Sequence, residues 1–272
     1  MKIAALQMVS TPRVGDNLQR ARELAAQAAS AGAEMLVLPE YFCLMGLHDR
    51  DKLAHAEVEG TGPIQQTLAG IAREHRVWLV GGTLPLRMAG VEDRAYNATL
   101  VVGPDGRQVV RYDKIHLFRF DDGERRYDEA ATLRPGAEVR TFDARARDGG
   151  AWRVGLSICY DLRFPELYRA MMQPPCDLIA VPSAFTHATG SAHWELLLRA
   201  RAVENQCYVV ASAQGGRHEN GRRTYGHSMV IDPWGEVLAV QADGDGVVLA
   251  ELRRERLQQV RTQLPALAHR VL

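Results

Sequence analysis

The chain has 272 residues, of which 46% are hydrophobic and 24% are charged, and its 33 basic and 33 acidic residues give a formal net charge of +0. A chain of this length can bury a substantial core, and its balanced charge argues against general binding to nucleic acid or to an anionic membrane. No apolar run approaches the length of a membrane span. Basic pairs such as Arg222-Arg223 are flanked by acidic residues, so we expect them to form solvated surface.

The N-terminus and the cysteines bear on the cellular compartment. The segment MKIAALQM lacks the long apolar stretch and the cleavage site of a signal peptide. The four cysteines, Cys43, Cys159, Cys176 and Cys207, form no CxxC pair and no Cys/His metal spacing. We therefore expect a cytoplasmic protein with reduced thiols.

Hydrophobic periodicity in the first half of the chain predicts strands alternating with helices. The alanine- and leucine-rich segment 17–30 has helical spacing, and Gly32 follows where the helix should end. Pro104-Asp105-Gly106 between two apolar runs indicates a β-hairpin. In chain order we expect a strand at 2–8, a helix at 17–30, a strand at 35–38, a helix at 64–75, a strand at 77–83, a hairpin formed by 98–102 and 108–112, and a loop at 120–136.

The second half of the chain continues the same alternation. In chain order we expect a strand at 152–158, a helix at 166–172, a strand at 177–181, a helix at 194–204, a strand at 208–213, a hairpin formed by 228–231 and 237–240, a strand at 247–252 and a helix at 254–263. This order indicates an α/β protein with covered sheets, and the hairpins predict mixed rather than purely parallel sheets. No linker interrupts it, so we expect one domain spanning residues 1–272.

Three residues could carry chemistry because each stands at the end of a strand. Cys159 ends an apolar run just before a helix, where free backbone N–H groups stabilise a thiolate or an oxyanion. Glu40 ends the run LVLPE, and partial burial would raise its pKa toward that of a general base. Lys114, in RYDKIHLF, is a cation in a half-apolar setting. Taken singly, they could also be a core thiol, a loop carboxylate and a surface lysine.

Together, the segments LVLPEYF, RYDKIHLF and GLSICYDLRFPE resemble the nitrilase, or carbon–nitrogen hydrolase, superfamily, whose hallmark is a Glu-Lys-Cys triad in this chain order. The resemblance spans essentially the whole chain. It implies a four-layer α-β-β-α sandwich with mixed sheets. It also implies homodimers or higher homo-oligomers, paired through the helices at 166–172 and 194–204.

The resemblance also implies further site residues. Glu129, in YDEAATLRPG, matches a second glutamate that assists the triad, although Ala130 follows it where family members often have serine. The backbone N–H of Tyr160 would help to stabilise the oxyanion.

The segment AQGGRH…YGHSMV…DPWG is similar to the branch of this family that hydrolyses deaminated glutathione, which neighbours the ω-amidase branch. Both branches have an arginine at the position of Arg163, where a guanidinium would hold a substrate carboxylate. Phe185, Thr189 and Tyr41 match pocket positions, but they could equally be a core aromatic, a loop hydroxyl and a core tyrosine.

The implied reaction is hydrolysis of a small, linear, carboxylate-bearing amide, with deaminated glutathione as the first candidate. It needs no cofactor and passes through a thioester on Cys159. Alternatives are an ω-amidase acting on α-ketoglutaramate, an N-carbamoyl amidohydrolase, a true nitrilase, and a non-catalytic scaffold of the same fold.

The histidines and the glycine pattern do not add a metal or a nucleotide. His187 and His193 have no third ligand in a recognisable spacing, so we expect a loop histidine and a histidine at a helix start, with no metal. His116 and His227 have no assigned role. The absence of a P-loop or GxGxxG motif argues against a nucleotide cofactor.

Overall fold

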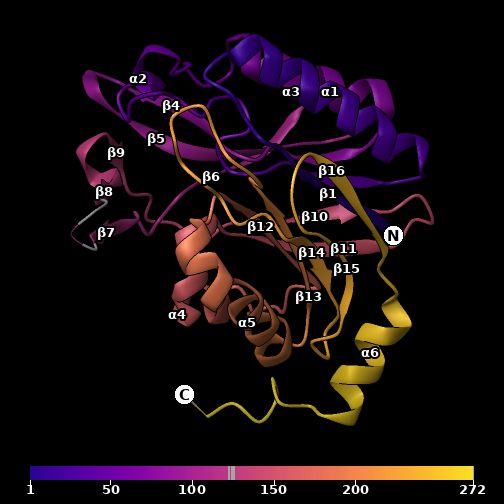
Figure 1. Ribbon diagram of the computed structural model, residues 1–272. Coiled ribbons are helices and arrows are strands. Elements are labelled where there is room, and N and C mark those ends of the chain that lie inside the picture. The colour runs from indigo at the N-terminus through magenta and orange to yellow at the C-terminus, as the bar shows by residue number, and fades with distance from the viewer. Residues whose placement is uncertain (122, 124–125, 272) are drawn as a thin grey trace.

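Two β-sheets packed face to face organise the chain (Figure 1). The computed structural model describes residues 1–121, 123 and 126–271. The larger sheet contains β1 (Lys2–Gln7), β2 (Met35–Val37), β3 (Trp78–Val80), β4 (Leu84–Met88), β5 (Val91–Val102), β6 (Gln108–Asp113), β9 (Leu133–Arg134) and β16 (Gly246–Glu251). Its order is β16-β1-β2-β3-β5-β4, with β6 and β9 also paired to β5. β1, β2 and β3 are parallel, and β16 is antiparallel to β1. β5 is antiparallel to β3, β4 and β6 but parallel to β9.

The second sheet contains β10 (Thr141–Arg145), β11 (Ala151–Leu156), β12 (Leu178–Ser183), β13 (Tyr208–Ala213), β14 (Ser228–Ile231) and β15 (Val237–Gln241), in that order. β11, β12 and β13 are parallel, and the remaining neighbours are antiparallel. Both sheets are therefore mixed, as the hairpin signals predict. A small separate ribbon pairs β7 (Arg119–Asp121) with β8 (Arg126–Asp128).

Helices cover the outer face of each sheet (Figure 1). The larger sheet is covered by α1 (Val14–Ser30) and α3 (Pro63–His75), and the second sheet by α4 (Pro165–Ala170) and α5 (His187–Asn205). The remaining helical segments are α2 (Asp51–Ala54), α6 (Arg254–Gln263), η1 (Glu129–Ala131) and η2 (Cys159–Arg163). None of the helices in the described part of the chain is long and apolar enough to cross a membrane.

Alternating side chains of β1 show how the layers are held together. Ala4 and Leu6 belong to the core cluster that contains the buried faces of α1 and α3. Ile3 and Ala5 belong to the other cluster, which is shared with strands of the second sheet such as β11. Successive residues of a strand point to opposite faces, so the side chains of β1 contribute to both core clusters. The predicted four-layer α-β-β-α sandwich is confirmed.

The start of α5 differs from the sequence expectation of a helix at 194–204. The helix begins at His187, because the Thr186 side chain accepts a hydrogen bond from the Thr189 backbone N–H and caps it. Gly190 lies within the helix, where a Cβ would stand 2.3 Å from the Cβ of Tyr225. A glycine normally argues against a helix interior, yet here the contact with Tyr225 requires it.

Three further expectations need correction. The loop expected at 120–136 contains β8, η1 and β9 among its described residues, while positions 122 and 124–125 of that segment lie outside them. The strand expected at 98–102 begins at Val91, where it pairs with the unpredicted β4. β10 was also not predicted, because its polar and apolar residues, TFDAR, resemble surface loop.

Candidate active site

Strand ends from both sheets meet at one place in the molecule. Glu40 follows β2 of the larger sheet, and Lys114 directly follows β6. Cys159 follows β11 of the second sheet and is the first residue of η2. The ends of parallel strands are where α/β proteins gather functional side chains. All three residues are buried.

Lys114 is the centre of the polar cluster. Its side chain is 0% exposed, and its Nζ donates to Glu40 Oε1 at 2.8 Å. The same Nζ lies 3.0 Å from Glu129 Oε1 and 2.9 Å from Glu129 Oε2. One ammonium therefore holds two carboxylates together in a setting where an unpaired charge would be costly.

Further hydrogen bonds fix both carboxylates. Asn97 Nδ2 donates to Glu40 Oε1 at 2.8 Å. Glu129 accepts from the Tyr41 hydroxyl at 2.7 Å and from the Phe118 backbone N–H at 2.7 Å. Thus, Glu129 is held on three sides and has little freedom to move, although its side chain keeps 12% exposure.

The environment separates the pKa values of the two glutamates. Burial raises the pKa of Glu40, and the charge of Glu129 adds to this, while Lys114 opposes it. Burial also acts to raise the pKa of Glu129, but Lys114 and the Phe118 N–H outweigh it and lower the pKa. Burial alone would lower the pKa of Lys114, yet the charges of Glu129 and Glu40 raise it well above its ordinary value. Lys114 thus stays protonated, and Glu40 is the better proton acceptor of the two carboxylates.

Cys159 has an unusual backbone and a thiol that stays neutral at rest. Its φ of 48° lies in the left-handed region, which non-glycine residues rarely adopt and which occurs at functional turns. Burial raises the pKa of the thiol well above its ordinary value, and the negative charge of Glu40 adds to this. Lys114 and the Ala184 backbone N–H act in the opposite direction without reversing it. Attack by this sulfur therefore requires a base to take its proton.

Tyr160, next in the chain, presents a backbone N–H at the start of η2. The first hydrogen bond of this turn is donated by Asp161 N to Ile158 O at 3.0 Å, so the Tyr160 N–H precedes the bonded residues. Its aromatic ring packs edge-on against Phe118 and Phe164.

Asp161 ties the cysteine turn to the segment that carries Lys114. This fully buried carboxylate accepts from the Ile158 backbone N–H at 2.9 Å and from the Tyr112 hydroxyl at 2.7 Å. It also accepts from the His116 backbone N–H at 2.9 Å, and His116 Nδ1 lies 2.7 Å away. His116, for which the sequence suggested no role, stacks on Phe164. The turn after β11 and the segment after β6, which belong to different sheets, are thereby held together.

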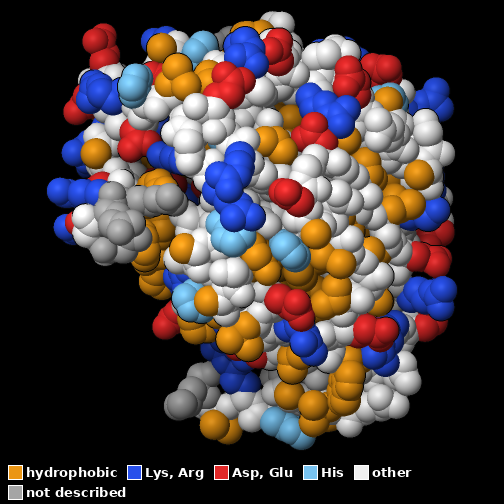
Figure 2. Space-filling view, in the orientation of Figure 1, with side chains coloured by type: hydrophobic (Ala, Val, Ile, Leu, Met, Phe, Trp, Pro, Cys, Tyr) orange, Lys and Arg blue, Asp and Glu red, His pale blue; other side chains and the backbone are white. Residues whose placement is uncertain are grey.

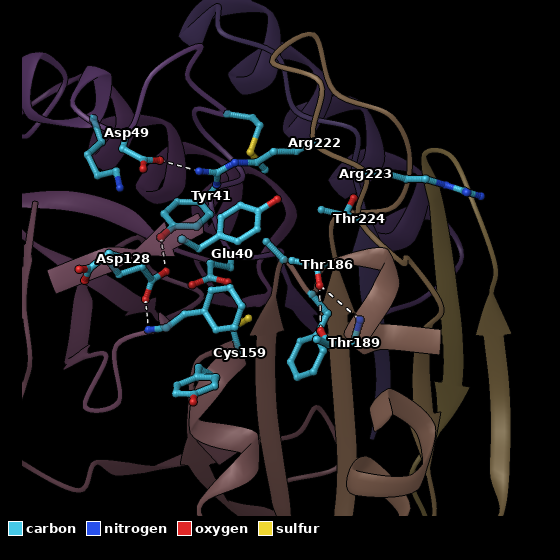
Figure 3. Close-up of a pocket in the computed structure, with 18 of the residues that line it drawn as sticks. Glu40, Tyr41, Asp49, Asp128, Cys159, Thr186, Thr189, Arg222, Arg223 and Thr224 are labelled. Atoms are coloured by element: carbon cyan, nitrogen blue, oxygen red, sulfur yellow. Dashed lines mark hydrogen bonds and ion pairs between the residues drawn. The ribbon is translucent and has the colours of Figure 1, made fainter. Parts of the chain in front are cut away.

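Glu40, Glu129, Cys159 and Tyr160 line a pocket with about 730 Å³ of empty space, which includes open solvent (Figure 3). The predicted residues that line it are Glu40, Tyr41, Glu129, Cys159, Tyr160, Arg163, Phe185 and Thr189. Lys114 lies behind the carboxylates rather than on the wall.

Arg163 lies on the pocket wall without a carboxylate partner among the described residues. Its guanidinium is 5.8 Å from the ring centre of Tyr160 and 5.5 Å from that of Phe185, and its Nη1 lies 3.3 Å from His193 Nδ1. Aromatic rings hold the guanidinium in place while leaving its donors available. Phe185 is buried against Trp194, and Thr189 Oγ1 lies 2.9 Å from Thr186 Oγ1.

Sequence reasoning missed one wall of the pocket. Lys52, Asp49 and Arg222 line it, and none belongs to a segment quoted for the triad. Arg222 was expected on the solvated surface, but its side chain is only 32% exposed and lies 5.1 Å from the ring centre of Tyr127. It also pairs with Asp49, far away in the chain, a partner that no local pattern could indicate.

The histidines do not gather into a metal site. His187, expected in a loop, is the first residue of α5, and His193, expected at a helix start, lies well inside that helix. His227 stacks on Tyr225 with ring centres 4.0 Å apart. Over residues 1–121, 123 and 126–271, no group of three or more His, Cys, Asp or Glu side chains could hold a metal ion.

Comparison with known proteins gives matches over nearly the whole chain. A family model described as carbon–nitrogen hydrolase matches residues 2–262. The deaminated glutathione amidase of Synechocystis sp. is 43% identical over 270 residues, which cover 98% of this chain and 97% of the relative. The omega-amidase of Homo sapiens is 37% identical over 265 residues, covering 97% and 92%. The crystal structure of the C. elegans NitFhit protein matches with a TM-score of 0.89 and 37% identity, over 99% of this chain and 64% of that chain.

Proposed function

This chain belongs to the carbon–nitrogen hydrolase family, and on that premise we propose that it is a cysteine-dependent amidase. Its proposed substrate is a small, linear, carboxylate-bearing amide, and deaminated glutathione is the first candidate. The similarity to amidases named for that substrate supports this choice.

One observation carries the proposal: Lys114 Nζ contacts Glu40 and Glu129 at the edge of a pocket that also exposes Cys159. The base and the nucleophile thus line one pocket, and the cation contacts the base from behind the wall. A non-catalytic scaffold would have no need for two buried carboxylates on one ammonium, which is an expensive arrangement to bury.

In the first half of the proposed reaction, the Cys159 sulfur attacks the amide carbonyl carbon while Glu40 takes the thiol proton. Lys114 and the Tyr160 backbone N–H stabilise the negative oxygen of the tetrahedral intermediate. The C–N bond then breaks, and the proton held by Glu40 passes to the leaving nitrogen. A thioester remains on Cys159.

In the second half, a water molecule attacks the thioester carbon and Glu40 takes its proton. The C–S bond breaks, the acid product leaves, and the proton returns to the sulfur. Glu129 assists by keeping Lys114 in place. The raised pKa of Glu40 suits a group that must both accept and return a proton.

Arg163 is proposed to hold the carboxylate at the acyl end of the substrate. Its aromatic contacts and lack of a described carboxylate partner support that role. Fixing the remote end orients the reacting carbonyl against the sulfur, and so binding energy contributes to rate.

A substrate panel tests the proposal. Purified protein and Cys159→Ala should be assayed with deaminated glutathione, α-ketoglutaramate, N-carbamoyl-β-alanine and a simple nitrile. We expect the highest kcat/KM for deaminated glutathione and no turnover by the variant, whose circular dichroism should match that of the parent. Turnover that survives in the variant would refute the nucleophile, and a clear preference for α-ketoglutaramate would make the protein an ω-amidase.

We also propose that the protein is a homodimer, or a larger homo-oligomer, located in the cytoplasm. On α5, Leu196 is 68% exposed, and Val203 is exposed one heptad further along. Hydrophobic side chains are visible on this face of the molecule in Figure 2. Exposed apolar residues on one helix face favour contact with a second copy. Size-exclusion chromatography with light scattering should give a dimer or larger, and a monomer at micromolar concentration would contradict the proposal.

A further inference from the structure

The pocket wall formed by Lys52, Asp49 and Arg222 has no part in the reaction described above. It lies toward one end of the pocket, with Tyr41 and Glu40 between Arg222 and Cys159 in the view of Figure 3. Arg163, the proposed binder of the acyl carboxylate, has different neighbours, namely Tyr160, Phe185 and His193. The cations of this wall, Lys52 and Arg222, therefore differ in surroundings from Arg163.

Lys52 is the cation of this wall whose charge is not paired. Its Nζ donates to Thr132 Oγ1 at 3.2 Å and lies 5.7 Å from the ring centre of Tyr41. Among the described residues it forms no ion pair, whereas Arg222 is paired with Asp49. An ammonium has three donors, so two remain for a ligand.

The electrostatic setting of Lys52 fits the arrival of an anion. Burial lowers the pKa of Lys52, and the nearby charges of Glu129 and Asp49 offset this only in part. A bound carboxylate would supply the missing counter-charge. Tyr41, on which Lys52 lies, donates its hydroxyl to Glu129, so Lys52 is one aromatic ring away from the reacting groups.

A peptide-like leaving group carries the charge that this wall could bind. Deaminated glutathione releases cysteinylglycine, whose free carboxylate is two residues from the scissile nitrogen, or about 7 Å when extended. α-Ketoglutaramate releases ammonia, so its leaving group has no carboxylate that this wall could bind. Recognition of the leaving group would therefore distinguish the two substrates.

Building on the proposed amidase function, we propose that Lys52, supported by Arg222, binds the terminal carboxylate of the leaving group and selects peptide-like amides over simple primary amides. Lys52 supplies the free charge, and Arg222 supplies the guanidinium donors that Asp49 does not use. Arg163 holds the acyl end, so the substrate is fixed at both ends with its amide at Cys159.

The test removes the charge from the protein and from the substrate in turn. Parent protein, Lys52→Met, Lys52→Arg and Arg222→Gln are assayed with deaminated glutathione, with its C-terminal carboxamide analogue and with α-ketoglutaramate. In the parent, replacing the substrate carboxylate by the amide should lower kcat/KM about tenfold or more, the usual effect of removing a charged partner. In Lys52→Met the preference for the carboxylate substrate over its carboxamide analogue should fall to about twofold or less. Arg222→Gln should reduce this preference, whereas Lys52→Arg should keep it.

Matched controls separate recognition from general damage. Arg50→Met and Arg217→Gln remove exposed cations close in sequence to Lys52 and Arg222 but outside the pocket lining, and they should keep the preference for the carboxylate. A preference in Lys52→Met equal to that of the parent would overturn the inference and leave the amidase function standing. A parent protein that hydrolyses α-ketoglutaramate but not deaminated glutathione would overturn both the proposed substrate and this inference.

Discussion

Replacing Lys114 by methionine should cost the protein a large part of its stability as well as its activity. Lys114 is 0% exposed and contacts Glu40 at 2.8 Å and Glu129 at 2.9 Å. Methionine fills a similar volume but leaves both carboxylates without a cation. Removing one partner of a buried ion pair costs about 3–5 kcal/mol. We therefore expect the free energy of unfolding to fall by about that amount near pH 8.

The loss in the free energy of unfolding of Lys114→Met should be smaller at low pH. The pKa of Lys114 in the folded protein is raised well above 10.5, so its charge is the same in the folded and unfolded states between pH 5 and 8 and adds no slope there. In the variant, burial without the cation would raise the pKa of both carboxylates above the unfolded value. Groups with a raised folded pKa stabilise the fold while they are protonated, and this is lost as the pH rises through that pKa. Lys114→Met should thus unfold more easily at pH 8 than at pH 5.5.

Urea denaturation at both pH values measures the effect. With a slope of about 3 kcal/mol per molar urea, the expected cost lowers the midpoint by about 1–1.7 M at pH 8. Lys52→Met is the control, because Lys52 has no carboxylate partner among the described residues and should lose about 1 kcal/mol or less. A deficit in Lys114→Met below about 1 kcal/mol, with no dependence on pH, would refute the view that this ammonium offsets two buried charges.

Three other predictions concern the same site. Glu129→Gln should move the acidic limb of the kcat/KM profile to lower pH, because the charge of Glu129 raises the pKa of Glu40; an unchanged limb would show that Glu40 is not the titrating base. Arg163→Gln should lower kcat/KM about 100-fold for keto-acid amides but far less for an uncharged aliphatic amide, and equal losses on both would exclude carboxylate binding. Asp161→Asn should cost about 2–3 kcal/mol in thermal unfolding and also lower kcat, since it leaves donors of Ile158 and His116 poorly matched; a variant with full stability and rate would contradict the anchoring role.

Much of the fold could be predicted from local patterns. The helix expected at 254–263 and the strand expected at 208–213 have those bounds in the structure, as α6 and β13. Both have a periodicity that depends on neighbours in the chain. The errors occur where distant contacts decide the outcome, as at Gly190, which makes room for Tyr225.

The candidate site also combines features visible in the local sequence with features set by distant contacts. Glu40 and Cys159 were singled out because each ends an apolar run, and Lys114 because it follows a hairpin strand in a half-apolar setting. These features are visible in the neighbouring residues. Their convergence is a property of the two packed sheets. The resemblance to a family indicated that the three residues act in one reaction. No single segment indicates this by itself.

What the sequence determined by itself was many of the strands and helices, because backbone preference and side-chain alternation are local. It also determined the reactive residue types at the strand ends. Only the tertiary structure decided that Lys114 would hold two carboxylates, that Asp161 would join the cysteine turn to His116, and that Lys52 and Arg222 would face the same pocket. These depend on which distant segments come together, and that is set by packing of the whole core rather than by neighbouring residues.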